Sequence, residues 1–99
     1  MSRSDDILAA IRAVLDGFAE ELRGYRVVLF GSRATGRARE RSDFDIGVSG
    51  PSPLPAAVFH RIADRLDEIP TLYRIDWVDL TAASPTFQRE ALKTTEVLH

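Results

Sequence analysis

Two aspartates separated by one residue are the clearest chemical feature of this sequence. Asp43 and Asp45 flank Phe44 in residues 42–48, where polar and apolar residues alternate. This period-two pattern predicts a strand whose carboxylates project from one face while its apolar side chains enter the core. Two carboxylates this close repel each other unless a proton or a cation lies between them. The spacing therefore predicts a magnesium site, since Mg²⁺ takes hard oxygen ligands and shares its remaining positions with substrate phosphates. A turn or cap that ends the preceding loop is the alternative interpretation.

A third aspartate, Asp76, interrupts the otherwise apolar residues 75–78. A charge in the middle of such a strand is costly unless it is paired or binds a cation. If this strand lies beside the one that carries Asp43 and Asp45, all three carboxylates can point at the same spot. Asp79 is the competing choice, but strand alternation puts it on the other face, at a strand end where an acid commonly caps a turn. We therefore predict Asp76 as the third metal ligand and Asp79 as a structural or peripheral residue.

A turn bracketed by two glycines, residues 31–36, follows an apolar strand. Its glycine spacing matches that of a P-loop, but Arg37 and Ala38 stand where a P-loop carries its phosphate-binding lysine and its magnesium-binding hydroxyl. The sequence therefore excludes a P-loop NTPase. Such a turn can still bring backbone N–H groups and the Ser32 hydroxyl close to a phosphate. A plain strand-to-helix turn is the alternative.

The first elements that must position these residues follow from the periodicity of apolar side chains. Residues 4–22 carry apolar side chains at helical spacing, which predicts a helix. Ser4 is a suitable N-cap, and Gly24 is a suitable residue just past the C-terminal end of this helix. Residues 27–30 are apolar on both faces, which is typical of a central strand. We expect the aspartate pair to lie on the next strand.

The second half of the chain completes the predicted order. Pro55 suits the first position of a helix that Pro70 ends, and residues 74–80 alternate as a strand. Ser84 opens a last short helix, and residues 97–98 add an edge strand. The order predicts an α+β fold, in which a small mixed β-sheet has its helices packed on one face, because three amphipathic helices cover one face but not two. We expect a single domain over residues 1–99.

Composition narrows the classes of protein. The chain has 99 residues, of which 44% are hydrophobic and 28% charged, as in a globular domain and unlike a disordered tail. With 13 basic and 15 acidic residues, its net charge of −2 argues against an extended nucleic-acid footprint. The absence of cysteine excludes disulfides, thiol catalysis and Cys-ligated zinc. Acidic residues among the first apolar ones exclude a signal peptide or a membrane span there, so we expect a cytoplasmic protein with no membrane partner.

Together these features resemble the nucleotidyltransferase superfamily of the DNA polymerase β type, and more closely its minimal nucleotidyltransferases. The resemblance runs from about Tyr25 to the C-terminus and rests on residues 31–36, 42–46 and 74–80. One departure is Thr35, where the family often carries Arg or Lys. This difference would weaken a phosphate contact without removing a metal ligand.

The resemblance implies a polymerase β-like palm with a two-magnesium site and ATP as the substrate. Two magnesium ions that bridge the α-phosphate stabilise both the entering and the leaving oxygen. The implied catalytic residues, which are also the metal ligands, are Asp43, Asp45 and Asp76. The implied nucleotide-binding residues are Gly31, Ser32, Arg33 and Ser42; for Arg33, a solvated loop position is an equally good interpretation.

The function implied is Mg²⁺-dependent transfer of a nucleoside monophosphate to a hydroxyl, with AMP from ATP suggested by the resemblance alone. Minimal nucleotidyltransferases are often paired with a HEPN-type helical protein in toxin–antitoxin operons. The resemblance therefore implies a hetero-oligomer in which the HEPN-type partner carries or presents the hydroxyl, and an antitoxin-like role. The alternative is a non-catalytic nucleotide-binding subunit that neutralises or scaffolds a partner protein. The three intact aspartates favour catalysis.

Overall fold

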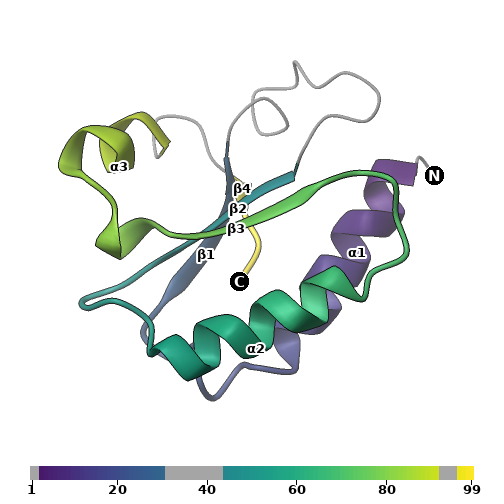
Figure 1. Ribbon diagram of the computed structural model, residues 1–99, viewed down its shortest axis with the longest axis horizontal. Coiled ribbons are helices and arrows are strands. Elements are labelled where there is room, and N and C mark those ends of the chain that lie inside the picture. The colour runs from purple at the N-terminus through teal and green to yellow at the C-terminus, as the bar shows by residue number, and fades with distance from the viewer. Residues whose placement is uncertain (1–2, 31–43, 92–95) are drawn as a thin grey trace.

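The computed structural model describes residues 3–30, 44–91 and 96–99, which form a mixed four-stranded sheet and its helices (Figure 1). The predicted order of elements is confirmed. In chain order these are α1 (Arg3–Asp16), β1 (Arg26–Phe30), β2 (Phe44–Ser49), α2 (Ala56–Asp67), β3 (Ile75–Asp79), the 3₁₀ helix η2 (Leu80–Ala82), α3 (Pro85–Ala91) and β4 (Glu96–Val97).

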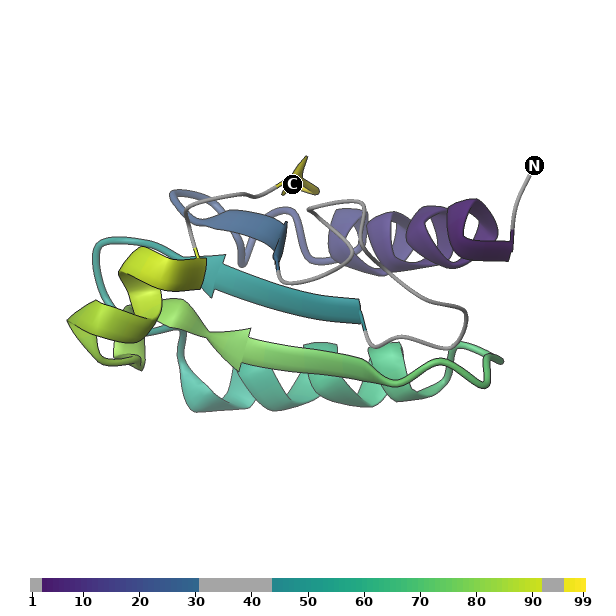
Figure 2. The ribbon, with the colours of Figure 1, turned by 90° about the horizontal axis from the view of Figure 1, so that it is seen from above.

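The sheet has the strand order β3-β2-β1-β4. β1 pairs antiparallel with both β2 and β4, whereas β2 and β3 are parallel. Figure 2 shows β2 and β3 pointing the same way and β1 pointing the opposite way. Parallel neighbours need a long crossover, and α2 supplies it here. The sheet is therefore mixed, as the sequence predicted.

One face of the sheet is covered by α1 and α2, which lie side by side (Figure 1). The alternate residues of β1 and β2 that face these helices are almost completely buried. Partly buried Ile75 and Trp77 of β3 pack against the same core. The buried residues of this core are Ile7, Ile11, Leu15, Phe18, Leu22, Val27, Leu29, Phe44, Ile46, Val48, Leu54, Ile62, Leu66 and Leu98.

The opposite face carries a much smaller apolar cluster, made of Val28, Phe30 and Leu80 with Val78 packed against it. The short helix α3 belongs to this side, because the ring of Phe87 meets that of Phe30 edge to face at 6.1 Å. Figure 1 shows α3 apart from α1 and α2, across the sheet. Packing of all three helices on one face was predicted, and it holds for α1 and α2 only. The physical reason is that Leu80 is buried against the face that α1 and α2 leave uncovered, where the ring of Phe87 also contacts Phe30 while remaining 44% exposed.

The first helix is shorter than its apolar spacing predicted. It ends at Asp16, and residues 17–24 follow as turns in which Phe18 N–H donates to the carbonyl of Leu15 at 2.9 Å. Gly17 explains the end, since glycine is a poor helix former. Gly24 has a φ of 86°, so it closes the turns in a conformation that favours glycine.

Candidate active site

Asp45 and Asp76 lie directly opposite each other on neighbouring strands. They are register partners in the parallel pairing of β2 with β3, so both side chains project from the same face of the sheet. Neighbouring strands are about 4.8 Å apart, which brings the two carboxylates within reach of one cation. Two of the three predicted acids are thus brought together. The third, Asp43, lies outside the described residues.

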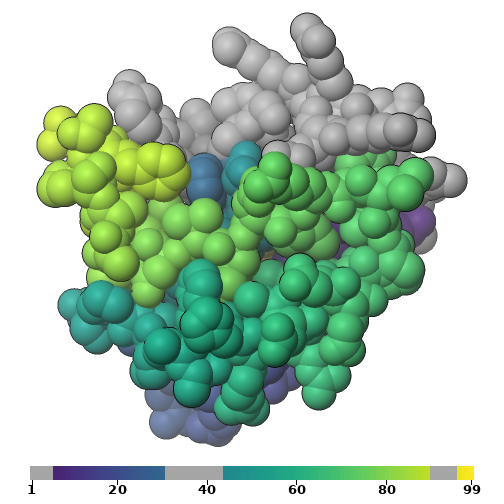
Figure 3. Space-filling view, viewed as in Figure 1, coloured from purple at the N-terminus to yellow at the C-terminus, as the bar shows by residue number. Residues whose placement is uncertain are grey.

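The same is true of the predicted nucleotide-binding residues. Gly31, Ser32, Arg33 and Ser42 all lie outside the described residues, so their roles stay predictions. The described part of the site lies beside the end of β1 and the start of β2. Figure 3 shows atoms of these two strands at the surface, between α3 and β3.

Burial of the neighbouring side chains determines which way the two acids point. Phe44 and Ile46, on either side of Asp45, are 0% exposed in the core between the sheet and the helices. Ile75 and Trp77, on either side of Asp76, pack against that same core. A shift of one residue would bury both carboxylates, so the apolar pattern fixes the face on which they lie.

The two acids sit beside an apolar wall. Phe30 of β1 is the register partner of Asp45, which gives a row of Phe30, Asp45 and Asp76 across three strands. In the next row Gly47 lies under Leu80, and a Cβ atom at Gly47 would lie 2.5 Å from Cδ1 of Leu80. Sequence reasoning gave Gly47 no role, although a glycine within a strand often marks such a close approach.

Arg74 forms an ion pair with the predicted metal ligand Asp76. Its Nε donates to Oδ1 of Asp76 at 3.1 Å; the Arg74 side chain is 75% exposed and that of Asp76 31%. Sequence reasoning gave Arg74 no separate role. The available signal was its position two residues before Asp76 on a strand, which puts both side chains on one face.

Asp79 has the structural role that the sequence predicted. Its Oδ2 accepts a hydrogen bond from the N–H of Leu54 at 2.8 Å, and its Oδ1 accepts one from the N–H of Thr81 at 2.9 Å. The Thr81 hydroxyl accepts from the N–H of Gly50 at 2.9 Å. These bonds join the connection before α2 to the start of η2, so both carboxylate oxygens of Asp79 are engaged away from Asp76.

The donor set on the open face fits a hard divalent cation. Asp45 and Asp76 offer the carboxylate oxygens that Mg²⁺ prefers, and a pair of ligands is what magnesium takes when it shares its sphere with water and phosphate. Within residues 3–30, 44–91 and 96–99, no group of three His, Cys, Asp or Glu side chains gathers at one point. Among the described residues, two of the three predicted ligands, Asp45 and Asp76, therefore lie together.

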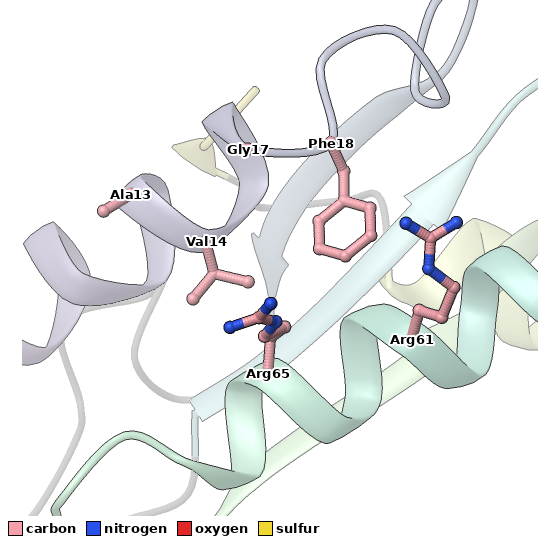
Figure 4. Close-up of a pocket in the computed structure, with 6 residues that line it drawn as sticks. All are labelled: Ala13, Val14, Gly17, Phe18, Arg61 and Arg65. Carbon is pink, nitrogen blue, oxygen red and sulfur yellow. The ribbon is translucent and has the colours of Figure 1, made fainter.

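A cavity of about 400 Å³ lies elsewhere, between α1 with the turns after it and α2. The Arg61 guanidinium lies 5.3 Å from the centre of the Phe18 ring, and it is 3.7 Å from the Glu21 carboxylate. The sheet separates this cavity from Asp45 and Asp76, so it is not part of the candidate site. Figure 4 shows the side chains that line it: Ala13, Val14, Gly17, Phe18, Arg61 and Arg65.

Fold and site together define a nucleotidyltransferase of the polymerase β type, and comparison with known proteins agrees. The family model for polymerase beta nucleotidyltransferases matches residues 19–99. The chain belongs to this family, which confirms the resemblance inferred from its motifs.

Individual relatives show which members of this family the chain is similar to. The chain is 29% identical, over 92% of its length and 76% of the other's, to the Haemophilus influenzae protein named "Probable protein adenylyltransferase MntA". A solved candidate minimal nucleotidyltransferase is 27% identical with a TM-score of 0.61, covering 93% of this chain and 92% of that one.

A second similar structure is the tri-AMPylated HEPN toxin of Shewanella oneidensis in complex with MNT antitoxin. It matches with a TM-score of 0.63 at 19% identity, covering 94% of this chain and 71% of that one. At this identity the likeness concerns the fold. The polymerase β-like fold predicted from the sequence is confirmed. Within the described ranges, no helix has both the length and the apolar character needed to cross a membrane.

Proposed function

We propose that this protein is a Mg²⁺-dependent adenylyltransferase that transfers AMP from ATP to a hydroxyl of a HEPN-type partner protein, and that it acts as an antitoxin. The observation that carries the proposal is the pairing of Asp45 with Asp76 on the open face of a polymerase β-type sheet. The name of the Haemophilus relative supports adenylyl transfer, and the Shewanella complex supports an AMPylated HEPN protein as the acceptor.

In this proposal Asp43, Asp45 and Asp76 hold the magnesium ions. Bound magnesium would offset the phosphate charge and polarise the α-phosphate toward attack. The acceptor hydroxyl releases its proton to water as its oxygen forms a new bond to the α-phosphorus. The bond from that phosphorus to the oxygen that bridges to the β-phosphate breaks, and pyrophosphate leaves. Gly31, Ser32, Arg33 and Ser42 bind the triphosphate, and residues 1–99 act as one nucleotidyltransferase domain.

The surroundings of Asp45 and Asp76 suit this chemistry. Phe30 and Leu80 are almost fully buried beside the carboxylates, so they keep water from one side of the site. Electrostatic interactions are stronger where water is excluded, so the wall favours the attraction between the carboxylates and a cation. Asp45 and Asp76 are half-buried on the face opposite α1 and α2, so in this proposal a nucleotide and a second protein approach them from that face. We place the reaction in the cytoplasm, where ATP is available.

Mass spectrometry of the partner tests the proposal. A HEPN-type protein recovered with this chain by pull-down is incubated with it, ATP and Mg²⁺. We expect the partner to gain the mass of one or more AMP units, and Asp45→Asn and Asp76→Asn to abolish the gain. Asp67→Asn is the matched control, because it makes the same charge change at the exposed end of α2.

Three other outcomes would contradict parts of the proposal. An unmodified partner with ATP still converted to pyrophosphate would indicate a different acceptor. ATP binding without any turnover, together with neutralisation of the partner by all four proteins, would indicate the non-catalytic subunit. Equal ATP affinity with Mg²⁺ and with EDTA, in the wild type and in both site variants, would overturn the metal site itself.

A further inference from the structure

The ion pair between Arg74 and Asp76 engages a carboxylate that the proposed function needs for a cation. We propose that Arg74 is an exchangeable counter-ion of this site. Its guanidinium neutralises Asp76 while no divalent cation is bound, and it moves to a phosphate oxygen of the nucleotide once the cation has taken the carboxylate. This inference rests on the proposed function and assigns Arg74 to triphosphate binding.

The backbone keeps Arg74 within reach of both positions. Its carbonyl accepts a hydrogen bond from the N–H of Phe44 at 2.8 Å, which fixes Arg74 beside the start of β2. Arg74 directly precedes β3, and its Nε donates to Oδ1 of Asp76 at 3.1 Å, so its side chain lies on the face that carries Asp45 and Asp76. The guanidinium is thus tethered next to both carboxylates, while the long side chain remains able to turn.

The pair is of the kind that a divalent cation can displace. Three-quarters of the Arg74 side chain is exposed. Among the described residues, it forms an ion pair with Asp76. Exposed ion pairs are weak, because water screens the charges and two side chains must be held in place. A divalent cation between Asp45 and Asp76 carries two charges and interacts with two carboxylates at once, so it competes well with the Arg74 guanidinium for Asp76.

Phosphate is a suitable second partner for a released guanidinium. The planar group has five N–H donors whose geometry matches phosphate oxygens. Without Arg74, the predicted triphosphate contacts are confined to residues 31–33 and 42. Nearby in the sequence, Thr35 stands at a position that often carries Arg or Lys in the family. Arg74 would compensate for that departure with a phosphate contact of its own.

The exchange predicts effects of opposite sign on two ligands, which the Arg74→Ala variant tests. Mn²⁺ alone, followed by electron paramagnetic resonance, should bind about two- to fivefold more tightly to the variant, because a weak competing cation has been removed. ATP at saturating Mn²⁺, followed by calorimetry, should bind about tenfold more weakly, because a charge-assisted contact to phosphate is lost. Arg74→Lys retains the charge and should lie between the wild type and Arg74→Ala in both measurements.

Arg26→Ala is the matched control. It removes the same charge from an exposed residue of β1, but Arg26 pairs with Ser49, at the other end of the strand from Phe30. Both affinities should stay at their wild-type values. Thermal unfolding of each variant confirms that it is folded.

The outcomes separate this inference from the proposed function. If wild-type protein shows no Mn²⁺ binding that depends on Asp45 and Asp76, the proposed function fails. If that binding is present and Arg74→Ala weakens both Mn²⁺ and ATP, Arg74 positions Asp76 and does not exchange. If the binding is present and neither affinity changes, the ion pair has no role in ligand binding, and the inference is overturned.

Discussion

The two faces of this sheet differ in what they hold. The face under α1 and α2 is lined by fully buried aliphatic and aromatic side chains. The other face has a small apolar cluster around Leu80 and, beside it, the pair of half-buried carboxylates on β2 and β3. Stability is concentrated on the first face and chemistry on the second, although both are made by alternate residues of the same strands.

Consecutive residues of β2 show the separation most directly. Phe44 points into the core and is 0% exposed, whereas Asp45 projects from the other face. Substitutions on one face should therefore change folding with little direct effect on the chemistry, and substitutions on the other face should do the reverse. Four changes test how complete this separation is, from the largest expected effect to the smallest.

Asp76→Asn should have the largest effect, and it should fall on activity. Loss of one carboxylate from a metal site removes several kcal/mol of transition-state stabilisation, so we expect AMP transfer to fall by about a thousandfold or more. The free energy of unfolding should change by less than about 1 kcal/mol, because the Arg74 pair that is lost is largely exposed. Quantitative mass spectrometry of the acceptor and urea unfolding measure the two effects. Transfer retained in an unstable variant would contradict the separation of the faces.

Phe44→Ala is the counterpart on the covered face. Phe44 is fully buried and its ring meets Tyr73 edge to face at 5.5 Å. Truncation of a buried Phe costs about 3–5 kcal/mol, a large part of the 5–15 kcal/mol that is typical for a whole domain. We expect the midpoint of urea unfolding to fall accordingly. Phe44→Leu should cost less than half as much, and a loss below about 1 kcal/mol for Phe44→Ala would show that the core tolerates a cavity there.

The order of elements and the grouping of Asp45 with Asp76 were predictable, because both follow from local patterns. Alternation in residues 42–48 and 74–80 set the faces of β2 and β3. The two acids can meet only if these strands are neighbours, which the sequence left open. The structure shows that they are, because β2 pairs in parallel with β3. Membership of a known family made the same grouping an expectation.

Features that depend on tertiary packing could not be predicted in the same way. The apolar spacing of Phe18 and Leu22 is helical, and both are buried, yet the chain reaches the core there through turns after Gly17. The face that α3 covers depends on where Leu80 packs, which no local pattern specifies. The pair of Arg74 with Asp76 depends on side-chain orientation at a surface, where sequence constrains geometry least.

Gly47→Ala tests whether the open face also contributes to stability. The added Cβ would lie 2.5 Å from Cδ1 of Leu80 and 3.1 Å from Cε1 of Phe30, so Leu80 must move. Such overpacking costs about 1–3 kcal/mol, and we expect urea unfolding to show a loss in this range. Leu80→Ala is the partner for a double-mutant cycle, because the two changes should destabilise less together than their sum. Strict additivity would show that Gly47 and Leu80 do not constrain each other.

Asp79→Asn should have the smallest effect, and it separates the two acids of β3. Asp79 accepts one hydrogen bond on each oxygen, from the N–H groups of Leu54 and Thr81. Asparagine keeps one acceptor and replaces the other with an NH₂ group, so one of these bonds is lost at a cost of about 1 kcal/mol. AMP transfer should stay within about threefold of the wild type, because both oxygens of Asp79 are engaged away from Asp45. Thermal unfolding and the AMP-transfer assay measure both effects in one preparation. A loss of transfer as large as that of Asp76→Asn, in a variant of near wild-type stability, would assign Asp79 to the catalytic site and extend the chemistry of β3 to the face that we describe as structural.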